Sequence, residues 1–137
     1  MAHDTHHHKE SFITKYIFSQ DHKMIGKQYL LTAIFMGAIG ITLSALFRMK
    51  LGWPDERFPL LEAILGSDAA PDGLLDSNWY LGLVTLHGTI MVFFVLTGGL
   101  SGTFSNLLIP LQIGARDMAS GLLNMIAYWL FFLSSLL

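Results

Sequence analysis

Residues 78–115 carry no charged side chain and read NWYLGLVTLHGTIMVFFVLTGGLSGTFSNLLIPLQIGA. As one α-helix this stretch would be about 57 Å long, nearly twice the roughly 30 Å hydrocarbon core of a bilayer. Trp79 suits a membrane interface at one end, and Pro110 with residues 112–114 is expected to end the helix at the other. The sequence therefore predicts a membrane-spanning helix over about residues 78–109.

Two further uncharged stretches extend this pattern to three spans. One runs from Gln28 to Phe47, and another begins near Met118 and continues to Leu137. The chain of 137 residues is 53% hydrophobic and 13% charged, against roughly 25% charged for a soluble domain, and its mean hydropathy is +0.52. We predict an all-α integral membrane protein, with the other two spans at about 27–48 and 118–137.

The remaining segments are an N-terminal tail and a connection. Residues 1–18 form a polar tail with an amphipathic lead-in, and residues 19–137 form the membrane part. The adjacent histidines His6–His8 could bind a metal, although such tails usually bind nothing specific. Residues 49–77 are punctuated by glycine and proline and are expected to be an outer loop with a short helix near its middle.

Charge predicts the orientation and excludes some partners. Four lysines precede the first span, Lys9, Lys15, Lys23 and Lys27, whereas Arg48, Lys50 and Arg57 follow it. The positive-inside rule therefore favours a cytoplasmic N-terminus. Without a basic stripe that carries interleaved aromatic residues, no nucleic-acid partner is expected. The chain has no cysteine, so disulfides and thiolate metal sites are excluded.

His87 is the one basic side chain within residues 78–115. An imidazole inside a membrane span is expensive to leave unbound, and such groups are functional candidates. One reading is an axial ligand of a metal macrocycle lying along the helix, because a neutral imidazole suits iron, zinc or copper. The other reading is a structural histidine bonded to a backbone carbonyl, and the residues alone leave both open.

Small residues predict where the first two spans pack. Gly98 and Gly102 form a small-xxx-small pair that lets backbones approach closely. In the first span, Gly40 and Ser44 lead at helical spacing to Arg48, which places this arginine on the side facing the bundle. The alternative is that Arg48 snorkels from the helix end to the membrane interface.

Three blocks of this sequence resemble subunit I of the haem-copper terminal oxidases. They are Asp21–Gly26, reading DHKMIG; His87–Phe94, reading HGTIMVFF; and Ser105–Ala119, reading SNLLIPLQIGARDMA. The resemblance covers residues from Ser19 to about Leu137, apart from an outer loop that looks longer than usual. It implies a bundle of about twelve helices, of which this chain would supply the first three.

The resemblance implies roles for six residues. His87 matches the axial ligand of the low-spin haem, Arg48 the arginine that bonds the formyl group of haem a, and Tyr80 a tyrosine near that haem. Asp117 matches the aspartate at the mouth of the D-type proton channel, and Asn106 and Asn124 match asparagines that line it. Asp117 would also suit a helix N-cap, with Asn124 two turns along the same helix face.

The family reduces O2 to water and pumps protons. The resemblance therefore implies a second haem and a copper ion, both ligated outside this chain, with no catalytic residue in the segment, which is inactive alone. It also implies the rest of subunit I, subunits II and III and membrane lipid as partners, in a bacterial plasma membrane.

Cytochrome c is the expected electron donor. The quinol-oxidising members place polar side chains at positions that are Ile39, Leu43, Trp79 and Gly82 here, and none of these can replace the hydrogen-bonding set. Many members also place a cation-binding glutamate where this chain has Lys50, whose ammonium cannot ligate Ca²⁺ or Na⁺. The alternatives are a quinol-oxidising subunit I, or a non-enzymatic three-helix membrane protein or transporter fragment with a structural His87.

Overall fold

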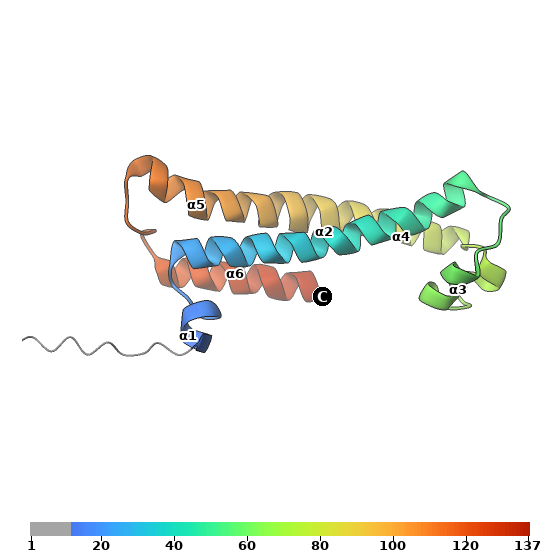
Figure 1. Cartoon of the computed structure of the whole chain (residues 1–137), viewed down its shortest axis with the longest axis horizontal. Helices are drawn as coiled ribbons and strands as arrows, with labels where there is room; N and C mark the ends of the chain where they lie inside the picture. The colour runs from blue at the N-terminus through green and yellow to red at the C-terminus, as the bar shows by residue number, and fades with distance from the viewer. Residues whose placement is uncertain (1–11) are drawn as a thin grey trace, which may run out of the picture. The chain divides into compact units, whose positions relative to one another are not determined.

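The computed structural model describes residues 12–137, so the His6–His8 run lies outside the described residues. All regular structure in the described part is helical, which confirms the all-α prediction. The elements are α1 (Phe12–Tyr16), α2 (His22–Gly52), α3 (Pro59–Leu65), η1 (Pro71–Gly73), α4 (Ser77–Thr89), η2 (Ile90–Ser101), α5 (Gly102–Ile113) and α6 (Gly121–Leu136) (Figure 1).

Two helices are long and apolar enough to cross a membrane, judged by length and composition. They are α2 and the 37-residue helix Ser77–Ile113, which joins α4, η2 and α5. Each is longer than the predicted span of about 27–48 or 78–109. The third predicted span is represented by α6, a shorter apolar helix of 16 residues.

The long helix passes through Pro110, where the sequence predicts an end, and stops at Ile113. Gly114 has a φ of +69°, a left-handed conformation that glycine adopts without penalty. The N–H of Gly114 donates to the carbonyl of Leu111, and that of Ala115 donates to the carbonyl of Pro110. This is the Schellman arrangement, so Gly114 rather than Pro110 ends the helix.

The chain divides into two compact units, and the first is the Tyr29–Gly102 unit. Within it, α2 runs beside the α4–η2 helix (Figure 1). A Cβ added to Gly102 would lie 2.6 Å from the Tyr29 ring, and one added to Gly99 would collide with Ala33. The close approach therefore uses Gly102, one member of the predicted pair, together with Gly99. The π-helical turns of η2 change which residues face α2, and residue spacing does not reveal them.

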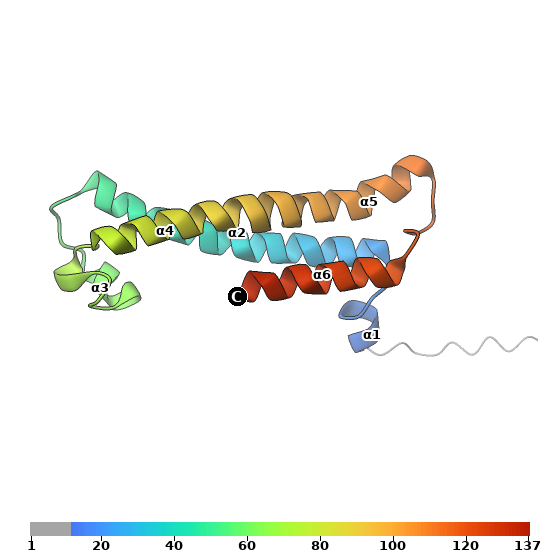
Figure 2. The same cartoon turned by 180° about the vertical axis from the view of Figure 1, so that it is seen from behind.

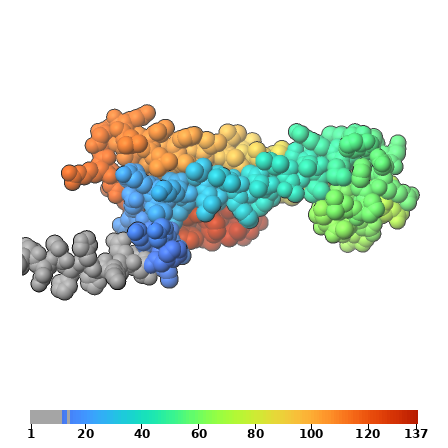
Figure 3. Space-filling view, viewed as in Figure 1, coloured from blue at the N-terminus to red at the C-terminus, as the bar shows by residue number. Residues whose placement is uncertain are grey.

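Residues 53–76 form an ordered cap on this unit. Leu61 and Leu75 are 1% and 2% exposed and pack with Leu46 and Leu83 of the two long helices. Figure 2 shows α3 beside the ends of α2 and α4, and Figure 3 shows the same segment as a closed cluster of atoms. The cap therefore contributes to the hydrophobic core of the unit.

The second unit contains Thr103–Leu137 and the segment that ends at Gln28, and we call it the Thr103–Leu137 unit. The Gln28 amide donates to the carbonyls of Tyr16 and Ile17 at 2.7 and 3.0 Å, which ties the end of α1 to α2. A Cβ added to Gly121 would lie 2.7 Å from the Gln20 carbonyl oxygen. These contacts, together with the hydrogen bond between Asn106 of α5 and Asn124 of α6, join α1, the start of α2, α5 and α6 in one unit.

Candidate functional sites

His87 lies near the end of α4 and is half-buried. Its Nδ1 lies 2.8 Å from the carbonyl oxygen of Gly40 on α2. A carbonyl oxygen only accepts hydrogen bonds, so Nδ1 carries the proton and donates. In a neutral imidazole with this tautomer, Nε2 would present its lone pair. A structural histidine would bond to a backbone carbonyl, and Nδ1 does so here. A metal ligand needs a second ring nitrogen without a hydrogen-bond partner, and Nε2 meets that requirement within residues 12–137, so the geometry is compatible with both interpretations.

Gly40 also leaves space for a side chain next to this hydrogen bond. Met91, one turn beyond His87, packs where Gly40 lacks a side chain, with its Sδ 2.8 Å from an added Cβ. A side chain at position 40 would displace the Met91 side chain from this place beside the carbonyl that His87 binds. Gly40 therefore supplies both the hydrogen-bond acceptor and the space for the Met91 side chain.

Phe47 joins His87 to Tyr80. Its ring meets the imidazole edge-on at 5.6 Å between centroids, and it meets the Tyr80 ring at 6.1 Å with an interplanar angle of 88°. Sequence reasoning missed Phe47, although it directly precedes Arg48. The ring contacts of Phe47 depend on the register between α2 and α4, and the residue pattern of one helix does not predict that register.

Within residues 12–137, the Arg48 side chain makes no hydrogen bond, ion pair or ring contact with the cluster of His87, Phe47 and Tyr80. Gly40 and Ser44 are buried as predicted, but Arg48 is exposed and pairs with no side chain within residues 12–137. Its guanidinium is therefore available to a group that the described chain does not contain.

The second cluster surrounds Asp117 in the Thr103–Leu137 unit. Asp117 lies on the loop between α5 and α6, and its Oδ1 accepts the Met118 N–H at 2.8 Å. The same oxygen lies 2.7 Å from Nδ1 of His22, the first residue of α2. Sequence reasoning missed His22, because 95 positions separate the two residues. The one available signal was its place in the DHKMIG block.

Asp117 does not cap α6. The helix begins at Gly121, and Ser120 is the cap, with its Oγ accepting the Leu123 N–H at 3.4 Å. The predicted start near 118, the N-cap reading and the shared helix face with Asn124 are therefore wrong. The physical reason is that Ser120 provides a cap oxygen closer to the helix, which leaves Asp117 in the loop.

Hydrogen bonds lower the pKa of Asp117 below its ordinary value. The largest cause is the Met118 backbone N–H, and the side chain and backbone N–H of His22 act in the same direction. These donors favour the charged carboxylate, while partial burial opposes them. Asp117 is therefore an ionised acceptor at neutral pH.

Asn106 and Asn124 form a direct pair. The Asn124 amide nitrogen donates to Oδ1 of Asn106, which is 2% exposed on α5. The structure thus brings together two of the three residues predicted for the proton channel. It places Asp117 with His22, and no hydrogen bond joins Asp117 to either asparagine among the described residues.

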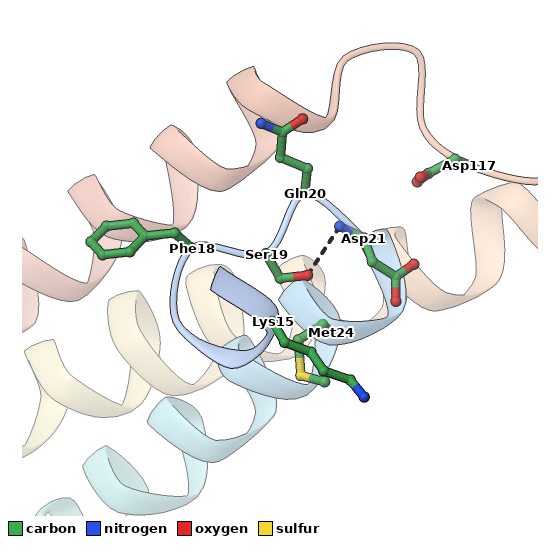
Figure 4. Close-up of a pocket in the computed structure, with 7 residues that line it drawn as sticks. All are labelled: Lys15, Phe18, Ser19, Gln20, Asp21, Met24 and Asp117. Carbon is green, nitrogen blue, oxygen red and sulfur yellow. Dashed lines mark hydrogen bonds between the residues drawn. The ribbon is translucent and has the colours of Figure 1, made fainter. Parts of the chain in front are cut away.

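A cavity of about 470 Å³ opens beside Asp117. Figure 4 shows Asp117 on its loop across from Asp21, with Ser19 accepting the Asp21 N–H. Lys15 of α1 and Met24 of α2 also line it. Charged and polar groups therefore surround an opening large enough for several water molecules.

These features describe a membrane-embedded helical protein with a metal-competent histidine and a separate solvent-facing carboxylate. The family described as cytochrome c and quinol oxidase polypeptide I matches residues 24–137, and the chain belongs to it. This family comprises oxidoreductases of respiratory electron transport.

Named relatives agree with this assignment. The chain is 41% identical to an alternative cytochrome c oxidase subunit 1 of Bradyrhizobium diazoefficiens, over 95% of this chain and 20% of that protein. It is 40% identical to cytochrome c oxidase subunit 1 of Thermostichus vulcanus, over 84% and 18% of the two chains. The corresponding protein of Cereibacter sphaeroides is 32% identical over 94% and 25%. The chain spans about a fifth of the length of these relatives.

Proposed function

We propose that the chain is the N-terminal part of the catalytic subunit of a proton-pumping cytochrome c oxidase, which reduces O2 to water. Two of its features carry separate tasks. His87 ligates the low-spin haem a, and Asp117 takes up protons at the mouth of a D-type channel. The second haem and the copper ion are ligated by parts of the complex outside residues 1–137.

The observation that carries the haem proposal is the hydrogen bond from His87 Nδ1 to the Gly40 carbonyl. Haem-ligating histidines commonly donate their other ring N–H to a carbonyl or carboxylate, which fixes the ring and increases its basicity. His87 has this arrangement inside an apolar helix. The residues therefore fit a haem whose iron is bound through Nε2, and a bound haem supplies one-electron transfer.

The neighbours of His87 support the same site. Positions Gly82 and Gly88 have open space where a side chain would stand, within the described residues. A flat macrocycle needs such clearance along the helix. Arg48, exposed and unpaired within residues 12–137, would bond the formyl group, while Tyr80 lies next to Phe47 and would face the haem edge.

The proton proposal rests on the low pKa of Asp117 and the cavity beside it. An ionised carboxylate open to water can accept a proton, and two bonded amides can order water further along a path. Asn106 and Asn124 would provide that second part. Asp117 would thus be the acceptor and the asparagines the lining of the path.

Cytochrome c is the proposed electron donor. Ile39, Leu43, Trp79 and Gly82 offer no hydrogen-bonding set for a quinol head group. The relatives above are named as cytochrome c oxidases. The proposed setting is a bacterial plasma membrane with a cytoplasmic N-terminus, where the chain assembles with the rest of subunit I and with subunits II and III.

The test is His87→Leu in the intact oxidase, followed by visible spectroscopy of the purified complex. Loss of the Nε2 ligand should remove the absorption band of the low-spin haem while the complex still assembles. Thr85→Val is the matched control, because Thr85 is exposed on the same helix and its hydroxyl, among residues 12–137, bonds only to the Leu81 carbonyl. A His87→Leu complex that retains the full low-spin band contradicts the proposal.

A further inference from the structure

The carboxylate of Asp117 has two unequal oxygen atoms. Three N–H groups point at Oδ1: the Met118 backbone at 2.8 Å, His22 Nδ1 at 2.7 Å and the His22 backbone at 3.4 Å. Among the residues that the structure describes, no donor contacts Oδ2. One oxygen is therefore anchored, and the other remains available for proton transfer.

His22 is held firmly enough to act as the anchor. It is 3% exposed, whereas the Asp117 side chain is 51% exposed. Asp21 fixes the start of α2, because its carbonyl accepts the N–H groups of Met24 and Ile25 and its carboxylate accepts that of Lys23. The imidazole therefore projects from a capped helix start toward a carboxylate on a separate loop.

The Asp117 carboxylate borders the cavity, so its orientation determines which oxygen faces the opening. Asp117 is one wall of the 470 Å³ opening, and Ser19 and Asp21 form part of another (Figure 4). The charged groups around the carboxylate are His22 and Asp21 at the start of α2 and Lys15 from α1. A carboxylate anchored through Oδ1 presents Oδ2 in one orientation instead of rotating between several.

We propose that His22 is a positioning residue for proton uptake: its Nδ1–H and backbone N–H fix Oδ1 of Asp117, so that Oδ2 is the atom that receives protons from the cavity. This inference rests on the proposed role of Asp117. It assigns to His22 the task of keeping the acceptor ionised and oriented, and His22 itself transfers no proton.

The test compares three variants of the intact oxidase at position 22. His22→Leu has similar bulk but no donor, whereas His22→Asn places an amide N–H about where Nδ1 lies. His22→Gln places the same amide nearer the position of Nε2. The Asn and Gln variants are both polar, so they separate donor position from polarity, and Gln provides the test if the Leu variant does not assemble.

The first readout is the titration of the Asp117 carboxyl by infrared spectroscopy, with Asp117→Asn identifying its band. We expect His22→Leu to raise the midpoint by about half a unit to one unit, because the Met118 N–H remains in place. The Gln variant should behave like Leu, and the Asn variant like the parent. An unchanged midpoint in both the Leu and Gln variants overturns the proposal.

The second readout is the pH profile of proton uptake. Its acidic limb should move upward in His22→Leu and return in His22→Asn, whereas a purely packing role would leave the limb unchanged. If the carboxyl midpoint moves but Asp117→Asn takes up protons normally, the contact of His22 stands and the channel role of Asp117 fails. If the midpoint moves and the uptake profile does not, the positioning role of His22 is refuted.

Discussion

His87 and Asp117 are each held by hydrogen bonds at a single side-chain atom, which is a donor in His87 and an acceptor in Asp117. His87 donates through Nδ1 to one backbone carbonyl, from a half-buried position between packed helices. Asp117 accepts three N–H groups on Oδ1, from an exposed loop. In each case the second atom of the group, Nε2 or Oδ2, has no hydrogen-bond partner among residues 12–137.

The difference shows how each orientation is maintained. The imidazole of His87 depends on close helix packing, because the Gly40 carbonyl reaches it only while glycines let the helices approach. The carboxylate of Asp117 depends on local donors, because a loop offers little packing. Disturbing the packing should therefore affect the His87 site, and disturbing charge should affect the Asp117 site.

The largest effect is expected at Asp117. Asp117→Asn keeps the shape and an acceptor oxygen but removes the charge, so proton uptake should slow by roughly a factor of 100, the low end for a positioned acid–base group. A pH-indicator dye during oxygen pulses measures this. Asp72→Asn is the control, because Asp72 is an exposed acid whose positive φ asparagine tolerates. Unchanged uptake in Asp117→Asn would refute the channel role.

A smaller effect is expected at the close contact between Gly99 and Ala33, near the His87 site. Gly99→Ala would force a methyl group against Ala33, so the oxidase should lose about 1–3 kcal/mol of stability. Thermal unfolding of the complex measures the loss, and the low-spin haem band should broaden because the His87 contact loosens. Gly52→Ala, at the end of α2 where an added Cβ meets nothing within 4 Å, should be neutral. Equal melting temperatures for the two variants would show that the helices do not pack through Gly99.

The smallest effect is the pH dependence from Asp117. Because folding lowers its pKa below the ordinary value of 3.8, its contribution to stability is full above that value and is lost as the pH falls through the folded pKa. The difference in unfolding temperature between the parent and Asp117→Asn should therefore shrink from about pH 6 to about pH 3. A constant difference would mean that the carboxylate gains nothing from its N–H donors.

The sequence predicted much of the helical architecture because hydropathy is a local property. Long uncharged runs identify apolar helices without reference to their neighbours, and the two long helices follow them. Their ends were harder to predict. The sequence suggested Pro110 as the end of α5 and Asp117 as the cap of α6. The hydrogen bonds at Gly114 and Ser120 instead determine where α5 stops and α6 starts.

The sequence by itself determined the all-helical class, the family and six candidate residues, since apolar runs and specific motifs are written in consecutive residues. Only the tertiary structure decided their partners. Gly40 for His87, Phe47 between His87 and Tyr80, and His22 for Asp117 all come from distant positions. Helix register, π-helical turns and loop geometry determine these contacts, because hydrogen bonds form only between atoms that folding brings together.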